Sequence, residues 1–407
     1  MEYHEIANIF PLISGDEFES LKKDIKKNGL IESIWTYENK ILDGRNRYRA
    51  CNEIGITPDM REFTGDDPLA FVISLNMKRR HLSASQLAFV ALAVEEYEGK
   101  KAKEREQIRK SKSTVQKVAQ SEQGKSRDIA AKSVGVNRQY VSDAKKIRAE
   151  RPDLEKKVVS GEMNIKQAVK EIKGDTLEKK KKEFIESTKK DIVNKPLISK
   201  QNAASFLESF MDGTVSLLIT DPPYSTDIDD IHSFVDGWLN LALKKIKPDG
   251  RAYICIGAYP EEIHAYLDVL INQDKFIVDS PLIWTYRNTL GITPKMKYNL
   301  NYQMILHLYS QSSKQLDTSI TNHNFSVQDI NAPDGRLGDR VHKWQKPSEL
   351  AARLITQSTE KDDVVIDCFA GSGTFLIEAA RLGRVASGCD IDDEAINICI
   401  ERGCERV

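Results

Sequence analysis

The pattern of apolar and polar positions changes near residue 196. From there to residue 407, runs of apolar residues alternate with segments whose apolar residues recur at helical spacing. The runs are LLIT, RAYICIG, FIVDSPLIWTY, QMILHLY, VVIDCFA and RVASGCDI. Nearly continuous apolar strands separated by helices are typical of a mostly parallel sheet that helices cover on both faces. We therefore expect residues 196–407 to form one α/β domain with a mostly parallel sheet.

The first 98 residues combine helical and strand-like patterns. The segment FESLKKDIKKNGL carries apolar residues at helical spacing and contains Asn28-Gly29, a helix stop signal. Short strands are predicted over residues 34–37 and 40–42, and another helix begins at a cap residue near Ser83. This mixture predicts an α+β domain over residues 1–98.

Residues 99–172 are predicted to be all-helical and basic. Residues 99–150 contain 15 Lys and Arg against 6 Asp and Glu. Such an excess suits a phosphate backbone, although it is equally typical of a solvated helical face. Residues 173–195 are charged and poor in apolar anchors, so we expect a helical or flexible linker there. The chain is thus expected to be multidomain, with boundaries at residues 98, 172 and 195.

The composition and the start of the sequence bear on the cellular compartment and say little about the activity. The 407 residues carry a formal net charge of −1, which argues neither for nor against nucleic acid. Cys255, Cys368 and Cys389 lie inside apolar runs, and no two cysteine pairs have zinc-ligand spacing, so we expect no metal. The start, MEYHEIANIF, lacks the basic region and apolar run of a signal peptide, and no apolar stretch approaches membrane-spanning length. A cytoplasmic protein without a membrane partner is expected.

The sharpest motif is Asp221-Pro222-Pro223-Tyr224, which directly follows the apolar run VSLLIT. Side chains at the carboxyl end of a strand in an open α/β sheet face the ligand crevice. An amino group conjugated to a base ring is a poor nucleophile, and acceptors for both its N–H bonds turn its lone pair towards an electrophile. The Asp221 carboxylate and the Pro222 carbonyl can be these acceptors, while Tyr224 can stack on a base taken out of the duplex. A plain surface turn is the alternative.

A second motif, Asp367-Cys368-Phe369-Ala370-Gly371-Ser372-Gly373-Thr374, stands between the strand VVI and a predicted helix. Glycines at this place let a ligand approach the backbone closely, and Asp367 is well placed for a cationic ammonium group. The next predicted strand ends in GCDID, where Asp390 or Asp392 can accept ribose hydroxyls. A dinucleotide-binding unit is the alternative, but the loop lacks G-x-G-x-x-G.

In this order and spacing, the two motifs resemble those of amino-methylating DNA methyltransferases, in the permuted arrangement called the β group. The resemblance covers residues 196–407 and implies a Rossmann-like fold with S-adenosyl-L-methionine as the cofactor. Lys346-Pro347 is similar to the family's segment before the cofactor strand, which helps to enclose the methionine end. Trp284 and the hairpin-like segment after it resemble the antiparallel strands that complete the family's sheet.

The resemblance also implies a reaction, the direct transfer of a methyl group to an exocyclic amino group of a DNA base. The implied catalytic residues are Asp221, Pro222, Pro223 and Tyr224. The implied cofactor-binding residues are Lys346, Pro347, Asp367, Phe369, Ala370, Gly371, Ser372, Gly373, Thr374, Asp390 and Asp392. Asp at the first motif position favours N6 of adenine, and N4 of cytosine is the alternative. The chain departs from the family at Gln201-Asn202, where Gly-Asp is frequent, and at Asp390, where Glu is more usual.

Within the first 98 residues, the segment LDGRNRYRA resembles the G-x-x-R phosphate motif of the ParB/sulfiredoxin-like fold. Gly44 would open a helix whose amino end, together with arginines, can hold an anion. The segment NMKR at residues 76–79 is similar to the E-N-x-x-R motif of partition protein B, with Leu75 in place of the Glu. The resemblance implies a site for phosphate, CTP or another nucleotide at Gly44, Arg45, Arg47, Asn76 and Arg79. Surface salt bridges of Arg45 and Arg47 are the alternative.

Residues 126–147 (SRDIAAKSVGVNRQYVSDAKKI) fit a helix-turn-helix with a turn at Gly135. Its apolar contacts would come from Ile129, Ala130, Val134, Val136 and Val141. The residues facing the major groove or its phosphates would be Asn137, Arg138, Gln139, Tyr140 and Ser142. Partition protein B also follows its N-terminal domain with this motif, and a generic helical hairpin is the alternative.

Two functions follow from these motifs. The first is a site-specific methyltransferase acting on double-stranded DNA, with an N-terminal DNA-binding and phosphate-sensing module, in a restriction-modification or phage setting. The second is a partition-type, nucleotide-regulated DNA-binding protein whose methyltransferase domain is degenerate. The sequence leaves a homodimer open.

Overall fold

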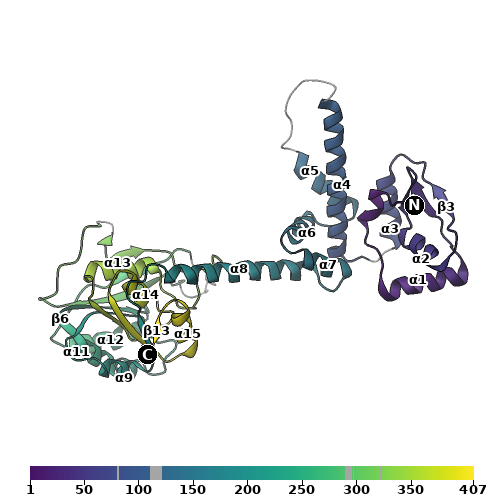
Figure 1. Ribbon diagram of the computed structural model, residues 1–407. Helices are drawn as coiled ribbons and strands as arrows, with labels where there is room; N and C mark the ends of the chain where they lie inside the picture. The colour runs from purple at the N-terminus through teal and green to yellow at the C-terminus, as the bar shows by residue number, and fades with distance from the viewer. Residues whose placement is uncertain (80–81, 111–121, 289–295, 297, 321–322) are drawn as a thin grey trace. The chain divides into compact units, whose positions relative to one another are not determined.

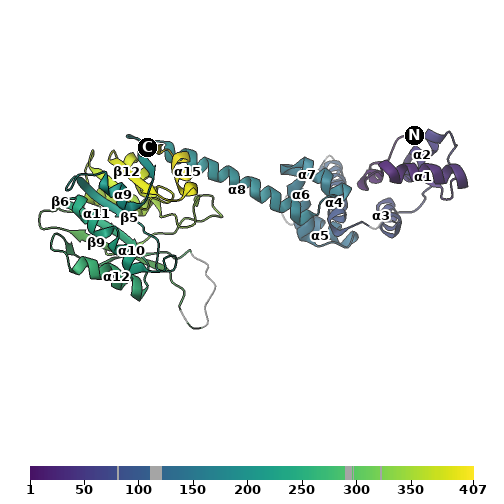
Figure 2. The same ribbon diagram turned by 90° about the horizontal axis from the view of Figure 1, so that it is seen from below.

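The computed structural model divides the chain into two compact units, Met1–Asp175 and Thr176–Val407. Figures 1 and 2 show both, with the chain coloured from purple at the N-terminus to yellow at the C-terminus. Among the described helices, none is both long enough and apolar enough to cross a membrane. The structure describes residues 1–79, 82–110, 122–288, 296, 298–320 and 323–407.

The N-terminal unit begins with a small sheet in the order β2-β1-β3, formed by β1 (Ile34–Tyr37), β2 (Lys40–Asp43) and β3 (Met60–Glu62). Strands β1 and β2 are antiparallel, and the two residues between them, Glu38 and Asn39, have φ values of 50° and 58°. Positive φ at both central positions gives the tight turn that matches strand twist, so the predicted strand pair is confirmed.

Three helices and a 3-10 turn accompany this sheet. They are η1 (Glu5–Ile9), α1 (Gly15–Asn28), α2 (Arg45–Ile54) and α3 (Pro68–Arg79). Helix α1 ends where the sequence predicts, because Gly29 has a φ of 74° and its N–H bonds back to the Ile25 carbonyl. Helices α1 and α2 pack through a cluster that contains Phe18, Ile25 and Ala50.

The rest of the N-terminal unit is helical. Its helices are α4 (Ala84–Lys110), α5 (Glu122–Ser133), α6 (Arg138–Glu150), α7 (Pro152–Ser160) and the first part of α8 (Ile165–Lys189). The predicted cap is confirmed, since Ser83 Oγ accepts a hydrogen bond from Gln86 N at 3.3 Å. The expected domain boundary at residue 98 falls inside α4, and most of the expected linker lies in α8. The division into domains 1–98, 99–172 and 196–407 stays a prediction.

The C-terminal unit is built on a ten-stranded sheet in the order β10-β8-β9-β6-β5-β11-β12-β4-β13, with β7 beside β9. Every antiparallel pair involves β9, and the other pairs are parallel. The expected α/β fold is therefore confirmed, with a mixed sheet. The strands are β4 (Leu197–Lys200), β5 (Val215–Thr220), β6 (Ile246–Ile256), β7 (Ile277–Val278), β8 (Leu282–Thr285), β9 (Tyr302–Tyr309), β10 (Val327–Asp329), β11 (Val364–Asp367), β12 (Val385–Asp390) and β13 (Glu405–Arg406).

Helices cover both faces of this sheet (Figures 1 and 2). Strand β5 shows why, because all of its residues are buried and they alternate between two cores: Leu218 joins one, and Leu217 and Ile219 join the other. The first core includes α9 (Ala203–Glu208), α10 (Ile231–Asp236), α11 (Leu239–Lys245) and α12 (Pro260–Ile271). The second includes α13 (Ser348–Ser358), α14 (Thr374–Arg381) and α15 (Asp393–Glu401).

The sheet order reverses between β5 and β11. From β5 the chain continues to β6 on one side, whereas β11 continues through α14 to β12 on the other side. In open α/β sheets, ligands bind beyond the carboxyl ends of the strands at such a switch point. The fold therefore locates the candidate site before any side chain is considered.

Candidate active site

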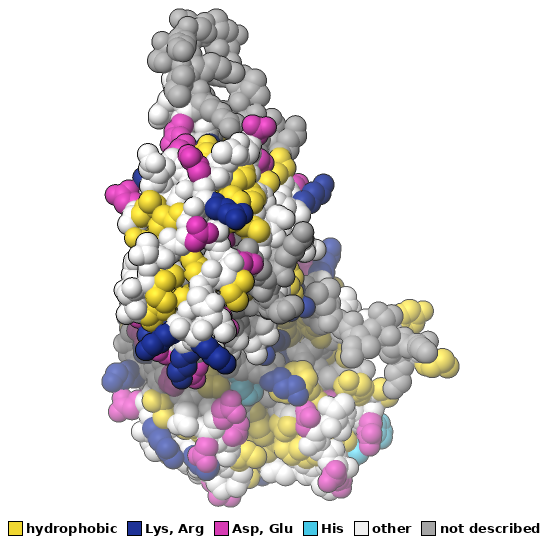
Figure 3. Space-filling view, turned by 90° about the vertical axis from the view of Figure 1, so that its right-hand side faces the viewer, with side chains coloured by type: hydrophobic (Ala, Val, Ile, Leu, Met, Phe, Trp, Pro, Cys, Tyr) yellow, Lys and Arg dark blue, Asp and Glu magenta, His cyan; other side chains and the backbone are white. Residues whose placement is uncertain are grey.

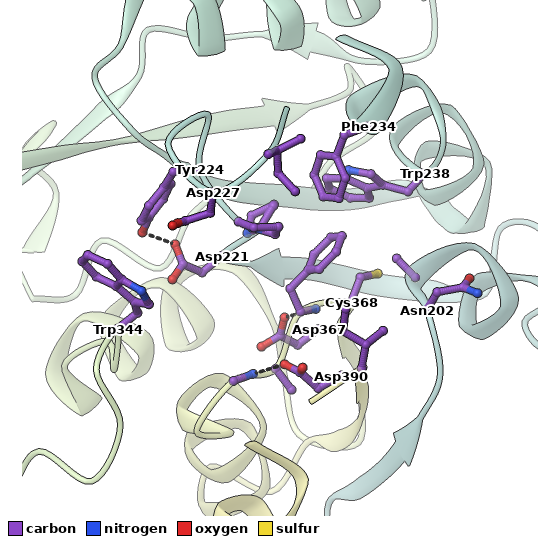
Figure 4. A pocket seen from close by; sticks show the side chains of 18 of the residues that line it. Asn202, Asp221, Tyr224, Asp227, Phe234, Trp238, Trp344, Asp367, Cys368 and Asp390 are labelled. Carbon is purple, nitrogen blue, oxygen red and sulfur yellow. Dashed lines mark hydrogen bonds between the residues drawn. The ribbon is translucent and has the colours of Figure 1, made fainter. Parts of the chain in front are cut away.

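A cavity of about 610 Å³ lies at this switch point, where the strands β5, β11 and β12 end (Figure 4). It brings together most residues that the sequence predicts for catalysis and cofactor binding. Those that line it are Asp221, Pro222, Pro223, Tyr224, Lys346, Asp367, Phe369, Ala370, Gly371, Ser372, Thr374 and Asp390.

One end of the cavity is formed by Asp221 and Tyr224, which follow β5. The Tyr224 hydroxyl donates a hydrogen bond to Asp221 Oδ1 at 2.7 Å, and Gln303 Nε2 donates to the Tyr224 hydroxyl at 2.6 Å. Burial raises the pKa of Tyr224 well above its usual range, and the charge of Asp221 adds to the rise. Tyr224 is therefore a neutral donor that fixes the orientation of the Asp221 carboxylate.

Lys346 lies at this same end. Its ammonium group donates to Asp221 Oδ2 and, at 3.0 Å, to the Tyr224 hydroxyl. The side chains of Lys346 and Asp221 are only 5% and 13% exposed, so the ion pair is largely shielded from water. A carboxylate oxygen has two lone-pair sites, so each oxygen of Asp221 can still accept one further bond.

Asp367 occupies the floor of the cavity at the end of β11. Its Oδ1 atom accepts hydrogen bonds from Thr220 Oγ1 at 2.6 Å and from Phe369 N at 3.1 Å. Burial raises the pKa of Asp367 to about 7, and the bonds from Thr220 and Phe369 oppose the rise. Within the described part of the chain, no Lys, Arg or His lies within ion-pair distance of this carboxylate. It is thus a buried acid that lacks a cation.

The loop after Asp367 bends around the next acidic residue. Gly371 N donates to Asp390 Oδ2 at 2.8 Å, and Ala370 N donates to the Cys389 carbonyl at 2.9 Å. Gly371 and Gly373 have φ values of 51° and 74°, a region that residues with a Cβ rarely adopt. The loop therefore presents backbone to the cavity and keeps Asp390 at its edge.

Aromatic rings form the remaining walls. Phe369 contacts Trp238 edge-on at 5.1 Å between ring centroids and lies 5.6 Å from Phe234. At the opposite end, Trp344 stands edge-on to Tyr224 at 5.9 Å and is 48% exposed (Figure 4). The cavity therefore has an apolar wall beside Phe369 and an open aromatic side beside the Asp221 carboxylate.

Three of the predicted cofactor residues do not line this cavity. Gly373 directly precedes α14, and Asp392 caps α15 by accepting a hydrogen bond from Glu394 N at 3.1 Å. Pro347 caps α13 and lines a separate cavity of about 470 Å³. Lys346 does line the main cavity, but its bonds are to the predicted catalytic residues.

Sequence reasoning missed several lining residues, among them Asn202, Phe234, Trp238, His342 and Trp344. Asn202, where the sequence departs from the family pattern, follows β4 and caps α9 by accepting a bond from Ser205 N at 2.9 Å. A polar residue between a strand and a helix at the carboxyl edge of the sheet is the signal that could have found it. The aromatic residues carry no comparable local signal.

The predicted phosphate residues of the N-terminal unit surround a separate cavity of about 360 Å³, which Gly44, Arg45, Arg47 and Asn76 line. Asp43 joins the two expected motifs, since it accepts bonds from Arg47 Nη2 at 2.9 Å and from Asn76 Nδ2 at 3.0 Å. Arg47 also pairs with Glu32, and Arg45 donates to the Phe10 carbonyl. The side chain of Arg79 lies outside the described residues.

The predicted helix-turn-helix residues lie on α5, α6 and the connection between them, where Gly135 has a φ of 72°. Asn137 caps α6 by accepting a bond from Gln139 N at 2.8 Å, and Arg127 donates to Ser142 Oγ at 3.2 Å. Arg138 is exposed and pairs with Asp128 at 3.4 Å, and Tyr140 is half-buried.

The expectation for Ile129 was wrong, because its side chain is 64% exposed. Among the residues of α5 whose burial is described, Ala130 and Ala131 are buried, as is Val134 just after the helix, and Ile129 lies one position away from this face. Figure 3 shows one face of the molecule, where Lys and Arg side chains are interspersed with Asp, Glu and apolar ones.

Comparisons with known proteins agree with this geometry. Residues 215–401 match a family model described as DNA methylase, of the N6/N4 type. The C-terminal half carries a DNA methylase domain of the N6/N4 family. The expected methyltransferase that depends on S-adenosylmethionine is confirmed at the level of the N6-adenine/N4-cytosine class, whose substrate is DNA.

Two relatives show how far the similarity extends beyond this family model. The chain is 26% identical over 230 residues to the type II methyltransferase M.HpaI of Haemophilus parainfluenzae, covering 49% of this chain and 72% of that protein. It is 26% identical over 255 residues to the type II methyltransferase M1.MboII of Moraxella bovis, covering 49% of this chain and 93% of that protein. Among solved structures, it is similar to the PvuII DNA methyltransferase (cytosine-N4-specific), with 20% identity, a TM-score of 0.46, and coverage of 52% and 88%.

The methylase domain fits its cofactor. S-Adenosylmethionine carries an ammonium group and ribose hydroxyls, and the cavity offers a buried Asp367 without a cation and an acidic Asp390 beside a glycine loop. An added Cβ at Gly371 would meet only His342, at 4.0 Å, so the space beside that backbone is open to a ligand.

Proposed function

We propose that the methylase domain methylates an exocyclic amino group of a base in double-stranded DNA at a specific sequence, with N6 of adenine as the favoured target. The observation that carries the proposal is one cavity with two acidic ends. Asp221, with Tyr224 and Lys346, forms the substrate end, and Asp367, with Asp390, forms the cofactor end. When bound, S-adenosylmethionine supplies an electrophilic methyl group on a sulfonium.

At the substrate end, Asp221 accepts one N–H of the base amino group, and the Pro222 carbonyl accepts the other. Both bonds orient the nitrogen lone pair towards the methyl group, so positioning supplies much of the acceleration. Pro223 stiffens the turn that holds this carbonyl in place. Trp344 is exposed beside Tyr224, and the two rings offer a stacking surface for a base taken out of the duplex.

Lys346 acts as a positioning residue at the substrate end rather than as a ligand of the methionine group. Its ammonium donates to the Asp221 carboxylate and to the Tyr224 hydroxyl, so it holds both groups in place. Together with the Tyr224 hydroxyl, it leaves one lone-pair site on each carboxylate oxygen for the substrate.

At the cofactor end, Asp367 would hold the ammonium of the methionine group, and Asp390 would accept hydrogen bonds from the ribose hydroxyls. Gly371, Ser372 and the rest of the loop would supply backbone contacts, and Phe369 would supply an apolar wall beside them. The support is the buried position of Asp367 and the bond from Gly371 N that holds Asp390 at the edge of the cavity.

Transfer of a radiolabelled methyl group from S-adenosylmethionine to unmethylated plasmid DNA tests the proposal. Asp221→Asn and Tyr224→Ala should reduce the rate by about 100-fold or more, in line with the loss of one preorganised polar contact. Asp274→Asn, which changes an exposed carboxylate outside the cavity, is the matched control. Nucleoside chromatography of the product separates N6-methyladenine from N4-methylcytosine. An inactive wild-type protein would favour the partition-type alternative.

A second proposal concerns the N-terminal unit, where we infer that α5 and α6 bind DNA as a helix-turn-helix. The support is the tight turn at Gly135, the capped start of α6, and the exposed side chains of Arg138 and Gln139 at that start. Arg138→Ala should reduce the slope of log DNA affinity against log salt concentration by about one, which is the contribution of one phosphate contact. Lys166→Ala, which removes an exposed charge on α8, should leave that dependence unchanged.

The ParB-like nucleotide site around Gly44 also stays a prediction. Its arginines already bond to groups of the protein itself, so a nucleotide would have to displace Glu32 from Arg47. Calorimetry of the full chain with CTP decides this, and absence of binding heat would leave Arg45 and Arg47 with a structural role only.

A further inference from the structure

We propose that His232, His264 and Asp268 form a binding site for one transition-metal ion of the zinc type, which would fasten α10 to α12. These are the members of the one group of potential metal ligands found among the described residues. The two helices lie side by side (Figure 2), and the cluster lies outside the cavity of the methylase domain.

The geometry needs little adjustment to hold an ion. His264 and Asp268 are one helical turn apart on α12, and His264 Nε2 lies 3.5 Å from Asp268 Oδ1. His232 approaches from α10, with Nδ1 at 3.6 Å from Asp268 Oδ2. All three ligand atoms lie within 4.8 Å of one another. Ligands of a tetrahedral zinc ion, with bonds of about 2.0–2.1 Å, lie about 3.3 Å apart.

The ligand set selects the class of metal. Two imidazoles and one carboxylate suit zinc, cobalt, nickel and copper, whereas magnesium and calcium prefer oxygen ligands alone. All three side chains are partly open to solvent, between 43% and 69% exposed, so water can complete the coordination. Three acidic residues, Asp227, Asp229 and Asp230, directly precede α10 and add local negative charge that favours a cation.

A simpler arrangement is a cluster without a metal, in which Asp268 alone links the two imidazole rings, whose centroids are 5.3 Å apart. In the metal-bound arrangement, both rings and the carboxylate bind the ion directly. The two arrangements differ in their response to added metal.

The consequence of the metal site reaches the cavity of the methylase domain. Helix α10 carries Ser233 and Phe234, which line that cavity. Helix α12 carries Glu262, which is 1% exposed and accepts bonds from Gly257 N at 2.7 Å and from Ser225 N at 3.0 Å, next to Tyr224. A bound ion would therefore couple the wall beside the cofactor loop to the segment that follows the catalytic motif.

The test uses the full chain after removal of metals with a chelator, and calorimetric titration with zinc chloride. Wild type should bind one equivalent, and His232→Ala and His264→Ala should each weaken binding by more than about tenfold, since even outer-shell partners change metal affinity by about 10- to 100-fold. His323→Ala, which removes a histidine elsewhere in the domain, should bind zinc as wild type does.

Cobalt chloride supplies a second readout. All six cysteines are buried, so the visible spectrum of the cobalt form should show nitrogen and oxygen ligands without thiolate charge-transfer absorption. Circular dichroism should show that both variants are folded, because the exchanged side chains lie at the surface. The proposal is overturned by absence of one-equivalent zinc binding, by variants that bind zinc as tightly as wild type does, or by a thiolate spectrum. None of these outcomes depends on methyl transfer.

Discussion

Replacing the buried acid Asp367 by Asn should make the cofactor-free protein more stable above neutral pH. Asp367 is 1% exposed, and burial raises its pKa to about 7 from the usual 3.8. The folded protein therefore keeps this proton up to about pH 7, whereas the unfolded chain releases it near pH 3.8. The contribution of Asp367 to stability is therefore largest below pH 3.8, falls as the pH rises from 3.8 to 7, and is constant above pH 7.

The size of the effect follows from the shift. About three pKa units correspond to about 4 kcal/mol of lost stability at pH 8, at roughly 1.4 kcal/mol per unit. An Asn at this position has no charge to desolvate and can still accept the bonds from Thr220 and Phe369. If the buried amide N–H groups of this Asn had no hydrogen-bond acceptor, the variant would lose about 1–3 kcal/mol of stability. We expect Asp367→Asn to gain about 1–3 kcal/mol at pH 8 and to lose this advantage towards pH 4.

Urea unfolding without cofactor, followed by tryptophan fluorescence at pH 5 and pH 8, measures this difference. Three tryptophans, Trp238, Trp284 and Trp344, lie in the C-terminal unit and report on its unfolding. Asp274→Asn serves as the control for an exposed carboxylate. A lower stability of Asp367→Asn than of wild type at pH 8 would contradict the cost of burying the Asp367 charge.

The same variant should lose affinity for S-adenosylmethionine, because the amide cannot neutralise an ammonium group. In wild type, that affinity should weaken about tenfold for each pH unit below 7, as the carboxylate takes up its proton. Calorimetric titration with S-adenosylmethionine at several pH values checks this. An affinity that does not change between pH 6 and pH 8 would show that the ammonium is bound elsewhere.

Three other substitutions separate the remaining roles. Gly373→Ala would place a Cβ 2.8 Å from Cys399 Sγ at a φ of 74°, so thermal unfolding should show a loss of stability of about 1–3 kcal/mol. Gly213→Ala has a positive φ but open space around the added Cβ, so it should lose only about 1 kcal/mol. Equal losses in the two variants would contradict the role of the Cys399 contact. Lys346→Met should lower the rate of methyl transfer while leaving the Kd for S-adenosylmethionine unchanged, because Lys346 donates to Asp221 and Tyr224. A weaker Kd with an unchanged rate would restore a cofactor-binding role. Trp344→Ala should raise the KM for DNA by about 5- to 150-fold, which corresponds to the loss of one stacking contact. The KM of Trp344→Phe should lie between those of wild type and Trp344→Ala. An unchanged KM in Trp344→Ala would exclude base stacking on this ring.

The sheet was largely predictable because its central strands are buried on both faces. Each apolar run in residues 196–407 contains a strand, although FIVDSPLIWTY forms two, β7 and β8, with Pro281 between them. Proline lacks the N–H that a continuous ladder needs. The strands that sequence patterns missed, β4, β10 and β13, have two to four residues and lie at or near an edge of the sheet, so they are too short for a period to show.

The site was predictable where it depends on strand ends and not where it depends on loops. Asp221, Asp367 and Asp390 lie at the carboxyl ends of strands whose order fixes their place, so the sequence alone predicts that they lie together. Lys346 and Trp344 belong to a segment without regular structure, and its path across the cavity is set by tertiary packing. For that reason the family resemblance gave the residue Lys346 but not its partner Asp221.

The pairing of β5 with β11 also has a consequence for the folding of the domain during translation. The two strands are hydrogen-bonded neighbours, yet Asp221 and Asp367 are separated by 146 residues of sequence (367 − 221). At about 5–20 residues per second, a ribosome would release β5 about 7–30 s before its partner strand. During this interval β5, apolar on both faces, has one edge without a partner. The catalytic strand therefore leaves one edge of the nascent chain unpaired during this interval, and slower translation should increase its aggregation.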